Sequence, residues 1–299
     1  MFSGAYTALV TPFQDGIVDE HALSGLVEFQ IQGGVSGLVI GGTTGEAATM
    51  TETERERVLA HVVERVAGRV QVVAGTGSND TAETIRRTQR ARELGVDAAM
   101  IVAPYYNKPT QEGLFQHFAA IASAVDLPIM LYNVPGRTAV NVLPETVVRL
   151  AAIPGIATIK EASGSIDQCS QIIRGTDDAF SLLSGDDSLT APVMSIGGRG
   201  VVSVVGNIVP HAVSRLTSAI LQGESLAARD IHLELFDLCQ AMFFDNNPTA
   251  VKTAASMLGL CDEEVRLPLT SMSSANRERL LAAMRDCSYV ASLEREIAA

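Results

Sequence analysis

Eight short apolar runs, each followed by a turn and then by a helical pattern, constrain the fold of this chain most strongly. Repetition of strand, turn and helix is typical of α/β proteins with a parallel sheet. The runs are uninterrupted rather than alternating, as expected for strands that are buried on both faces. The predicted strands are Ala5–Val10, Gly37–Gly41, Val70–Ala74, Ala98–Ala103, Ile129–Tyr132, Ile156–Lys160, Phe180–Ser184 and Gly200–Val204.

These units predict a (β/α)8 TIM barrel over residues 1–223, followed by a helical region over residues 224–299. The alternative, a doubly wound open sheet, would carry a GxGxxG turn after its first strand, and none stands there. Between the strands, Thr51–Ala67 opens with a capping-box-like Thr-x-x-Glu and carries apolar residues at helical spacing. Beyond Gly223 the sequence offers no convincing strand, so we expect helices that pack on the barrel.

Composition excludes several classes of function. The 299 residues include 22 basic and 34 acidic side chains, and a net charge of −12 would repel nucleic acids and anionic membranes. No apolar run reaches the roughly 20 residues of a membrane span, and the N-terminus lacks the features of a secretory signal, so we expect a cytoplasmic protein. The four cysteines form no CxxC pair and the five histidines have no metal-binding spacing, which predicts neither disulfides nor a metal site.

The active site of such a barrel lies at the C-terminal ends of its strands. Of the three lysines, Lys108 lies in a loop, Lys252 lies in the helical region away from the strand ends, and Lys160 ends the sixth strand. Burial at the barrel mouth disfavours the charged form of an amine, which can then form a Schiff base with a carbonyl substrate. The alternative for Lys160 is a structural ion pair with Glu161, although neighbours on a strand point to opposite faces.

Other side chains at the strand ends suit the same chemistry. Schiff-base chemistry needs a proton shuttle, for which Tyr132 and Tyr106 are candidates, with packing at the barrel rim as the alternative. Thr43 and Thr44 lie in a glycine-rich turn that offers hydroxyls and N–H groups to a carboxylate. Arg137, in a Pro-Gly loop, can hold a second carboxylate, and a solvated loop arginine is the alternative.

These residues lie in longer motifs that match a known family. The matching segments are GGTTGEAATM, AGTGSNDTAETI, PYYNKPTQEGLFQHF, LPIMLYNVPGRTA, TIKEASG, LLSGDDSL, GGRGVVSV and NNPTAVKTAASMLGL. With them the chain resembles, nearly end to end, the 4-hydroxy-tetrahydrodipicolinate synthases of the pyruvate-dependent aldolase group. Within this group, the paired threonines and the arginine of YNVPGRT resemble the synthases in particular.

The resemblance implies a catalytic set around one lysine. Lys160 would form an imine with pyruvate, whose carboxylate would lie near Thr43 and Thr44. Tyr132 would act as general acid and base, and Thr43 and Tyr106 would complete a proton relay to solvent. No metal or organic cofactor is implied, because the imine itself activates pyruvate.

The resemblance also implies the second substrate and the assembly. Arg137 would hold the carboxylate of L-aspartate 4-semialdehyde, and Gly185 and Val202 would line the pyruvate pocket. Tyr106 would reach into the site of a neighbouring subunit, in a homotetramer built as a dimer of dimers. The product would enter diaminopimelate and lysine biosynthesis.

The resemblance also bears on a lysine effector site. Four residues match those that bind inhibitory lysine in regulated members: Ala48, Asn79, Glu83 and Tyr105. Glu52 and Arg55, however, stand where those members carry histidines, and Ala47 replaces a serine. We therefore expect weak or absent inhibition by lysine.

Two other functions stay open from the sequence. An N-acetylneuraminate or 2-keto-3-deoxy-sugar-acid lyase of the same group would have little use for Arg137. A non-catalytic pyruvate- or lysine-binding scaffold would have lost Lys160 or Tyr132, and both are present.

Overall fold

Eight parallel strands close into a barrel in the computed structural model, which describes residues 2–297. The order around the barrel is β1-β10-β9-β8-β7-β6-β5-β4, so the first strand closes it by pairing with both β10 and β4. The strands are β1 (Gly4–Ala8), β4 (Gly37–Ile40), β5 (Gln71–Gly75), β6 (Ala98–Val102), β7 (Ile129–Asn133), β8 (Ile156–Glu161), β9 (Ser181–Ser184) and β10 (Gly200–Ser203). The predicted TIM barrel is confirmed, with strand ends that agree to within two residues.

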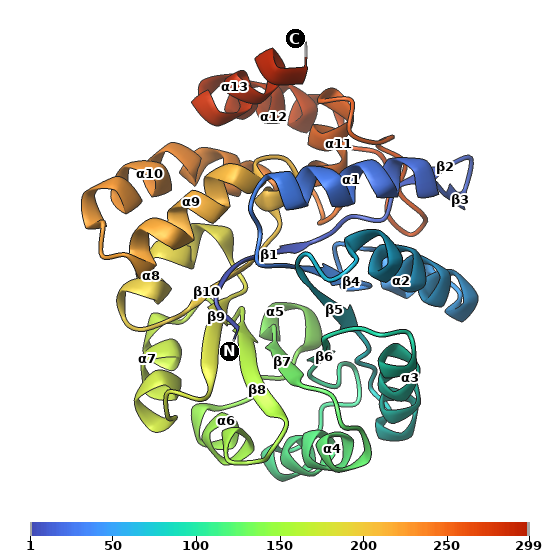
Figure 1. The fold of residues 1–299 in the computed structure, drawn as a ribbon, viewed down its shortest axis with the longest axis vertical. Helices are drawn as coiled ribbons and strands as arrows, with labels where there is room; N and C mark the ends of the chain where they lie inside the picture. Colours follow the sequence, from blue (N-terminus) through green and yellow to red (C-terminus); the bar gives the residue numbers. More distant parts are fainter. Residues whose placement is uncertain (1, 298–299) are drawn as a thin grey trace.

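Helices connect the strands and surround the barrel (Figure 1). They are α1 (Glu20–Gln32), α2 (Glu52–Val66), α3 (Thr81–Glu93), α4 (Gln111–Ala124), α6 (Pro144–Ala151), α7 (Ile166–Gly175), α8 (Thr190–Ser195) and α9 (Pro210–Leu221). The sequence did not predict the short elements, which are β2 (Phe13–Gln14), β3 (Ile17–Val18), α5 (Pro135–Thr138) and the 3-10 helices η1 (Ala47–Thr49), η2 (Asp187–Leu189) and η3 (Val205–Asn207).

Helix α2 shows how local sequence sets an element. The side chain of Thr51 accepts a hydrogen bond from the backbone N–H of Glu54, and the Glu54 carboxylate accepts one from the backbone N–H of Thr51 at 2.8 Å. This reciprocal capping box satisfies N–H groups that a helix N-terminus leaves free. The helix ends where Ala67 takes a left-handed conformation. The predicted helix and its capping box are confirmed.

Side chains rather than a channel fill the barrel interior, as expected for eight strands. The interior cluster runs from Phe2 and Tyr6 at the N-terminal end to Tyr132 at the mouth. Closure also needs a glycine, because a Cβ at Gly200 would lie 2.0 Å from the carbonyl oxygen of Gly4 on β1. Only glycine lets β1 and β10 approach this closely.

The C-terminal region is helical. It consists of α10 (Ser225–Ala241), α11 (Thr249–Met257), α12 (Ser274–Asp286) and α13 (Ser288–Ile297). Helix α10 packs on α9, and α12 packs on α10 and α11, with α12 and α13 on the outside of the barrel (Figure 1). The division into a barrel domain and a helical region at residue 223 stays a prediction, and its outer ends, residues 1 and 298–299, lie outside the described residues.

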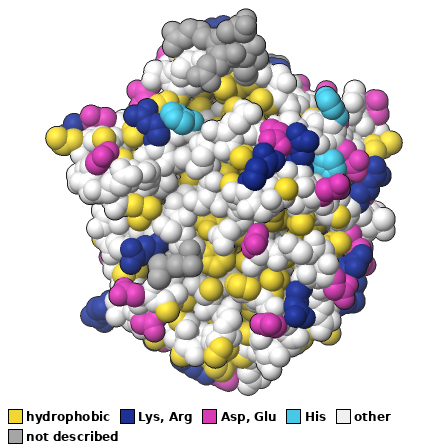
Figure 2. Space-filling view, viewed as in Figure 1, with side chains coloured by type: hydrophobic (Ala, Val, Ile, Leu, Met, Phe, Trp, Pro, Cys, Tyr) yellow, Lys and Arg dark blue, Asp and Glu magenta, His cyan; other side chains and the backbone are white. Residues whose placement is uncertain are grey.

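The charged side chains are dispersed. Figure 2 shows basic side chains scattered among acidic ones, with no basic patch on the face in view. Within residues 2–297, no helix combines the length and the apolar character needed to cross a membrane. The same residues contain no cluster of histidine, cysteine, aspartate or glutamate that could hold a metal ion, and all four cysteines are free.

Candidate active site

Lys160 lies at the C-terminal end of β8, with its side chain in a cavity at the barrel mouth and only 5% of the residue exposed. The register of β7 and β8 pairs it with Tyr132, and the Lys160 Nζ lies 4.3 Å from the centroid of the tyrosine ring. Glu161 points away from the cavity and accepts hydrogen bonds from Asn133 Nδ2 at 3.0 Å and Gln168 Nε2 at 3.1 Å. The ion pair between Lys160 and Glu161 is therefore not formed, as the alternation along a strand predicted.

The cavity brings together six of the predicted residues. Its lining comes from the ends of the barrel strands and from the C-terminal region: Ala8, Gly42, Thr43, Thr44, Met100, Tyr132, Val134, Arg137, Lys160, Ala162, Gly185, Asp186, Val204, Phe243 and Asn247. Tyr132 is 6% exposed and Thr44 is 3% exposed, whereas Arg137 on α5 is exposed at the rim. The arrangement places an amine, a phenol and hydroxyls inside, with a guanidinium at the entrance.

A tight turn presents the paired threonines. The backbone N–H of Glu46 donates to the carbonyl of Thr43 at 3.1 Å, and the Thr11 hydroxyl donates to the carbonyl of Gly45 at 2.8 Å. Glu46 itself takes a left-handed conformation with φ of 53°, which is uncommon for a residue with a side chain. Such a conformation persists only where the surroundings hold it in place.

The expectation that Lys252 lies away from the strand ends is wrong. Its Nζ donates to Glu46 Oε1 at 2.8 Å and to the carbonyl of Glu264, with the Lys252 and Glu46 side chains 0% and 1% exposed. The other oxygen of Glu46 accepts the backbone N–H of Arg266 at 2.9 Å. The C-terminal region thus returns to the mouth and holds the turn of the paired threonines, a long-range contact that local sequence patterns do not reveal.

Sequence reasoning also missed Asn247 and Phe243, which line the cavity from the segment after α10. The Nδ2 of Asn247 donates to Thr44 Oγ1 at 3.0 Å, and Asn247 is 7% exposed. The only available signal was the segment NNPTAVK, which entered the resemblance without a role for any of its residues.

Two neighbouring aspartates add negative charge near the mouth. Burial, reinforced by the carboxylate of Asp187, raises the pKa of Asp186 above its ordinary value, while the charge of Lys160 opposes the rise. Burial also raises the pKa of Asp187, whose Oδ2 accepts the backbone N–H groups of Val204 and Val205, each at 2.9 Å. Asp187 therefore fixes the loop after β10, and Asp186 lines the cavity.

Two predicted residues lie outside this cavity. Val202 is fully buried in the barrel interior, and Val204 rather than Val202 is among the lining residues. Tyr106 is 86% exposed, with φ of 73°, in the loop after β6. Tyr106 is not among the residues that line the cavity of Lys160 in the described chain, so its place in a proton relay stays a prediction.

The four residues of the predicted effector site also lie outside the cavity. Ala48 is in η1, Tyr105 is 40% exposed, and the carbonyl of Asn79 accepts a hydrogen bond from Asn107 Nδ2 at 2.9 Å. A hydrogen bond from Arg86 lowers the pKa of Glu83 below its ordinary value.

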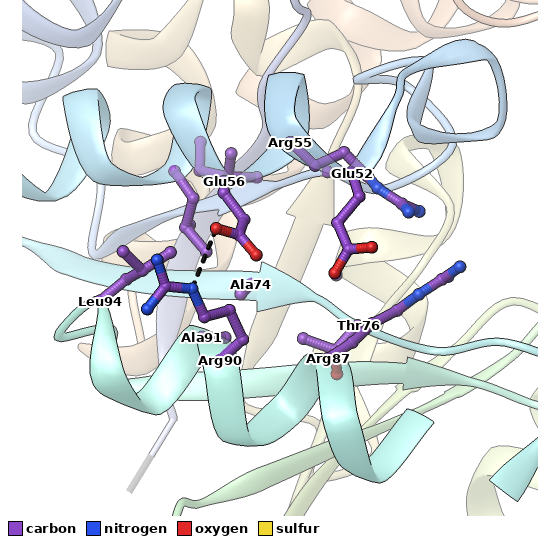
Figure 3. A pocket seen from close by; sticks show the side chains of 13 residues that line it. Glu52, Arg55, Glu56, Ala74, Thr76, Arg87, Arg90, Ala91 and Leu94 are labelled. Atoms are coloured by element: carbon purple, nitrogen blue, oxygen red, sulfur yellow. Dashed lines mark hydrogen bonds and ion pairs between the residues drawn. The ribbon is translucent and has the colours of Figure 1, made fainter. Parts of the chain in front are cut away.

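A separate pocket lies between α2 and α3, next to the predicted effector residues. Glu52, Arg55 and Glu56 line it from α2, and Arg87 and Arg90 line it from α3 (Figure 3). Arg90 Nε donates to Glu56 Oε2 at 2.9 Å. Burial lowers the pKa of Arg55, and the neighbouring charge of Arg87 lowers it further. The pocket thus concentrates guanidinium groups.

Comparisons with known proteins agree with this geometry. The model of the dihydrodipicolinate synthetase family matches residues 1–286. The 4-hydroxy-tetrahydrodipicolinate synthase of Thermomicrobium roseum is 53% identical over 293 residues, covering 98% of this chain and 97% of that protein. The solved synthase of Methylacidiphilum fumariolicum SolV has a TM-score of 0.96 and 43% identity, covering 99% of each chain. A chloride-inhibited dihydrodipicolinate synthase of Acinetobacter baumannii, solved with pyruvate, has a TM-score of 0.95 and 41% identity, covering 97% of this chain and all of that one. The chain belongs to the dihydrodipicolinate synthetase family.

Proposed function

We propose that this chain is a 4-hydroxy-tetrahydrodipicolinate synthase, which condenses pyruvate with L-aspartate 4-semialdehyde through a Schiff base on Lys160. The activity is that of its curated relatives, and pyruvate is the ligand of the Acinetobacter structure. The observation that carries the proposal is the burial of Lys160 in a cavity that also holds Tyr132, Thr44 and Arg137. This set matches the needs of an imine-forming aldolase.

The first half of the reaction activates pyruvate. The uncharged amine of Lys160 attacks the keto carbon, and water leaves as the imine forms. Tyr132, whose ring lies beside the Lys160 Nζ, donates the proton that the departing hydroxyl needs and accepts one from the methyl carbon, which gives the enamine. The pyruvate carboxylate binds the hydroxyls and N–H groups at Thr43 and Thr44. All these steps use groups of the chain itself, with no metal or organic cofactor.

The second half joins the two substrates. Arg137, exposed at the rim, binds the carboxylate of the semialdehyde and leads the aldehyde toward the enamine. The enamine carbon bonds to the aldehyde carbon, whose oxygen takes up a proton. The substrate amine then attacks the imine carbon, closes the ring and releases Lys160 as the free amine.

We further propose that the enzyme works as a homotetramer, a dimer of dimers, in which Tyr106 serves a neighbouring site. A large aromatic side chain that is 86% exposed and held at positive φ suits a contact with another subunit. The relay from Tyr132 through Thr43 would then end on the partner's phenol. Sedimentation velocity tests the assembly, and a monomer with full activity would contradict it.

Regulation by lysine is expected to be weak or absent. The carboxylate of Glu83 is already paired with Arg86 and Arg87, and a lysine ammonium would meet the further charge of Arg55. Strong inhibition of the purified enzyme by low lysine concentrations would contradict this expectation of weak regulation.

We place the enzyme in the cytoplasm, in diaminopimelate and lysine biosynthesis.

Two measurements test the proposed reaction. Borohydride reduction in the presence of pyruvate, followed by peptide mapping, should label Lys160, and a label on Lys108 or Lys252 would overturn the assignment. Pyruvate consumption should require L-aspartate 4-semialdehyde. Consumption with N-acetylmannosamine instead would keep the Schiff base but place the chain among the lyases.

A further inference from the structure

Glu161 is a buried carboxylate that no cation neutralises. Only 3% of the residue is exposed, and within residues 2–297 its carboxylate forms no ion pair. The donors to its two oxygens are all neutral: the backbone N–H of Ser163 at 2.7 Å, Asn133 Nδ2 at 3.0 Å and Gln168 Nε2 at 3.1 Å. Burial of a carboxylate without a cation destabilises a protein, so a charge at this place calls for an explanation.

An ionised carboxylate only accepts hydrogen bonds, and this property sets the direction of the amides around Glu161. Because the Nδ2 of Asn133 faces Glu161, its Oδ1 is left to accept the backbone N–H of Val142 at 3.0 Å. Gln168 likewise turns its Nε2 toward Glu161, and its Oε1 accepts from Asn141 Nδ2 at 2.9 Å. The charge thus selects one orientation for each amide.

The oriented amides hold both ends of the segment that carries Arg137. This segment, residues 134–141, is the arginine loop: it leaves β7 after Asn133 and contains α5. Across its base, Asn133 Nδ2 donates to Asn141 Oδ1 at 2.8 Å. The guanidinium of Arg137 forms no hydrogen bond or ion pair within the described part of the chain, and Arg137 lines the cavity at its rim. The place of the guanidinium therefore depends on the loop that carries it.

We propose that Glu161 is a positioning residue whose charge, acting through Asn133 and Asn141, holds the arginine loop so that Arg137 faces the second substrate. None of these three partners of the loop lines the cavity, so they act through the backbone of the loop and not on a substrate. The inference rests on the proposed function, in which Arg137 binds the carboxylate of L-aspartate 4-semialdehyde. It explains why the strand that presents Lys160 to the cavity buries a charge on its other face.

The first test replaces the charge of Glu161 by an amide of the same shape. Asn133 Nδ2 contacts both oxygens of Glu161, at 3.2 and 3.0 Å, so in Glu161→Gln the new NH2 group faces this donor whichever way it turns. We expect kcat/KM for L-aspartate 4-semialdehyde at saturating pyruvate to fall about 10-fold, as for one lost hydrogen bond. Borohydride trapping with pyruvate should proceed at the rate of the wild type.

Glu145→Gln is the matched control, because it makes the same change at an exposed glutamate of α6, and it should alter neither activity. Equal losses of both activities in Glu161→Gln would show a general structural role and would overturn the proposal. No loss of either activity would overturn it as well.

A double-variant cycle shows whether Glu161 acts through Arg137. If it does, Arg137→Ala already removes everything that the position of the loop provides. Adding Glu161→Gln to Arg137→Ala should then cause no further fall in kcat/KM for the semialdehyde. Effects that multiply would mean that Glu161 acts on the reaction by another route, which contradicts the proposal.

Asn141→Ala carries the test if Glu161→Gln does not fold. It cuts the same network at a half-buried position at the base of the loop, and it should lower kcat/KM for the semialdehyde without slowing borohydride trapping of pyruvate. An unchanged kcat/KM would overturn the proposal. Failure of the wild-type protein to consume pyruvate with the semialdehyde would instead refute the proposed function, whatever the variants do.

Discussion

Replacing Lys252 by methionine leaves a buried carboxylate without its cation. The Lys252 and Glu46 side chains are 0% and 1% exposed, so bulk water cannot take the place of the ammonium group. Removing one partner of a buried ion pair destabilises a protein by about 3–5 kcal/mol. The variant also leaves the carbonyl of Glu264 without its donor, although Glu46 keeps the N–H of Arg266. We therefore expect Lys252→Met to lower the free energy of unfolding by about 3–5 kcal/mol.

The assay is urea unfolding followed by circular dichroism at pH 7 and one protein concentration. The double variant Lys252→Met/Glu46→Gln removes both charges and keeps an acceptor for the N–H of Arg266, so it should recover about 2 kcal/mol of the loss. Pyruvate KM should rise in the single variant, because Glu46 ends the turn that carries Thr43 and Thr44. Arg229→Met, which breaks an exposed pair with Asp230, is the control and should leave stability unchanged.

The reasoning would be refuted by either of two results. Unfolding of Lys252→Met at the same urea concentration as the wild type would mean that the buried pair contributes no net stability. Alternatively, the double variant could be less stable than Lys252→Met, which would mean that an uncompensated charge is not the cause of the loss.

Three further changes test other parts of the structure. Burial lowers the pKa of His117 to about 4 from an ordinary value near 6.5, so the unfolded chain binds more protons between these values. The free energy of unfolding should thus fall by up to about 3 kcal/mol as the pH drops from 6.5 to 4. In urea titrations, His117→Gln should make the free energy of unfolding depend less on pH. Identical pH profiles for the variant and the wild type would contradict this. Arg137→Ala should reduce kcat/KM for the semialdehyde about 10-fold to 100-fold while borohydride trapping of pyruvate stays intact, and equal losses would contradict separate subsites. Gly200→Ala should lower the Tm sharply, because the new Cβ would collide with the carbonyl oxygen of Gly4. Gly136→Ala should leave the Tm unchanged, because no atom lies within 4 Å of a Cβ at that position. Equal Tm values for the two variants would show that β1 can shift to make room.

The barrel could be predicted because its signals are local. Uninterrupted apolar runs marked each strand, and the Thr51 and Glu54 pair marked the start of α2. The rule that strand ends form the site then brought Lys160 and Tyr132 together, and their register on β7 and β8 places them side by side.

The long-range contacts at the mouth could not be predicted in this way. Asn247 meets Thr44 and Lys252 meets Glu46 across more than 200 residues of sequence, and neither pair belongs to a periodic pattern. These contacts form because α11 packs against the barrel near the turn of Thr43 and Thr44. No short segment of the sequence indicates where α11 packs. The pairing of β2 with β3 is local, yet it was also missed, because two residues per strand are too few to show a periodic pattern.

The closure of the barrel has a consequence for synthesis of the chain from its N-terminus. Strand β1 is among the first parts to be made, yet its neighbour β10 ends at Ser203. The residues that support the turn of Thr43 and Thr44 are made after β10. They are Asn247, Lys252 and Arg266. Non-local contacts of this kind make folding slow, because long loops must close before the contacts can form. A chain cut short before Asn247 would therefore lack all three supports of this turn, even though every strand of its barrel had been made.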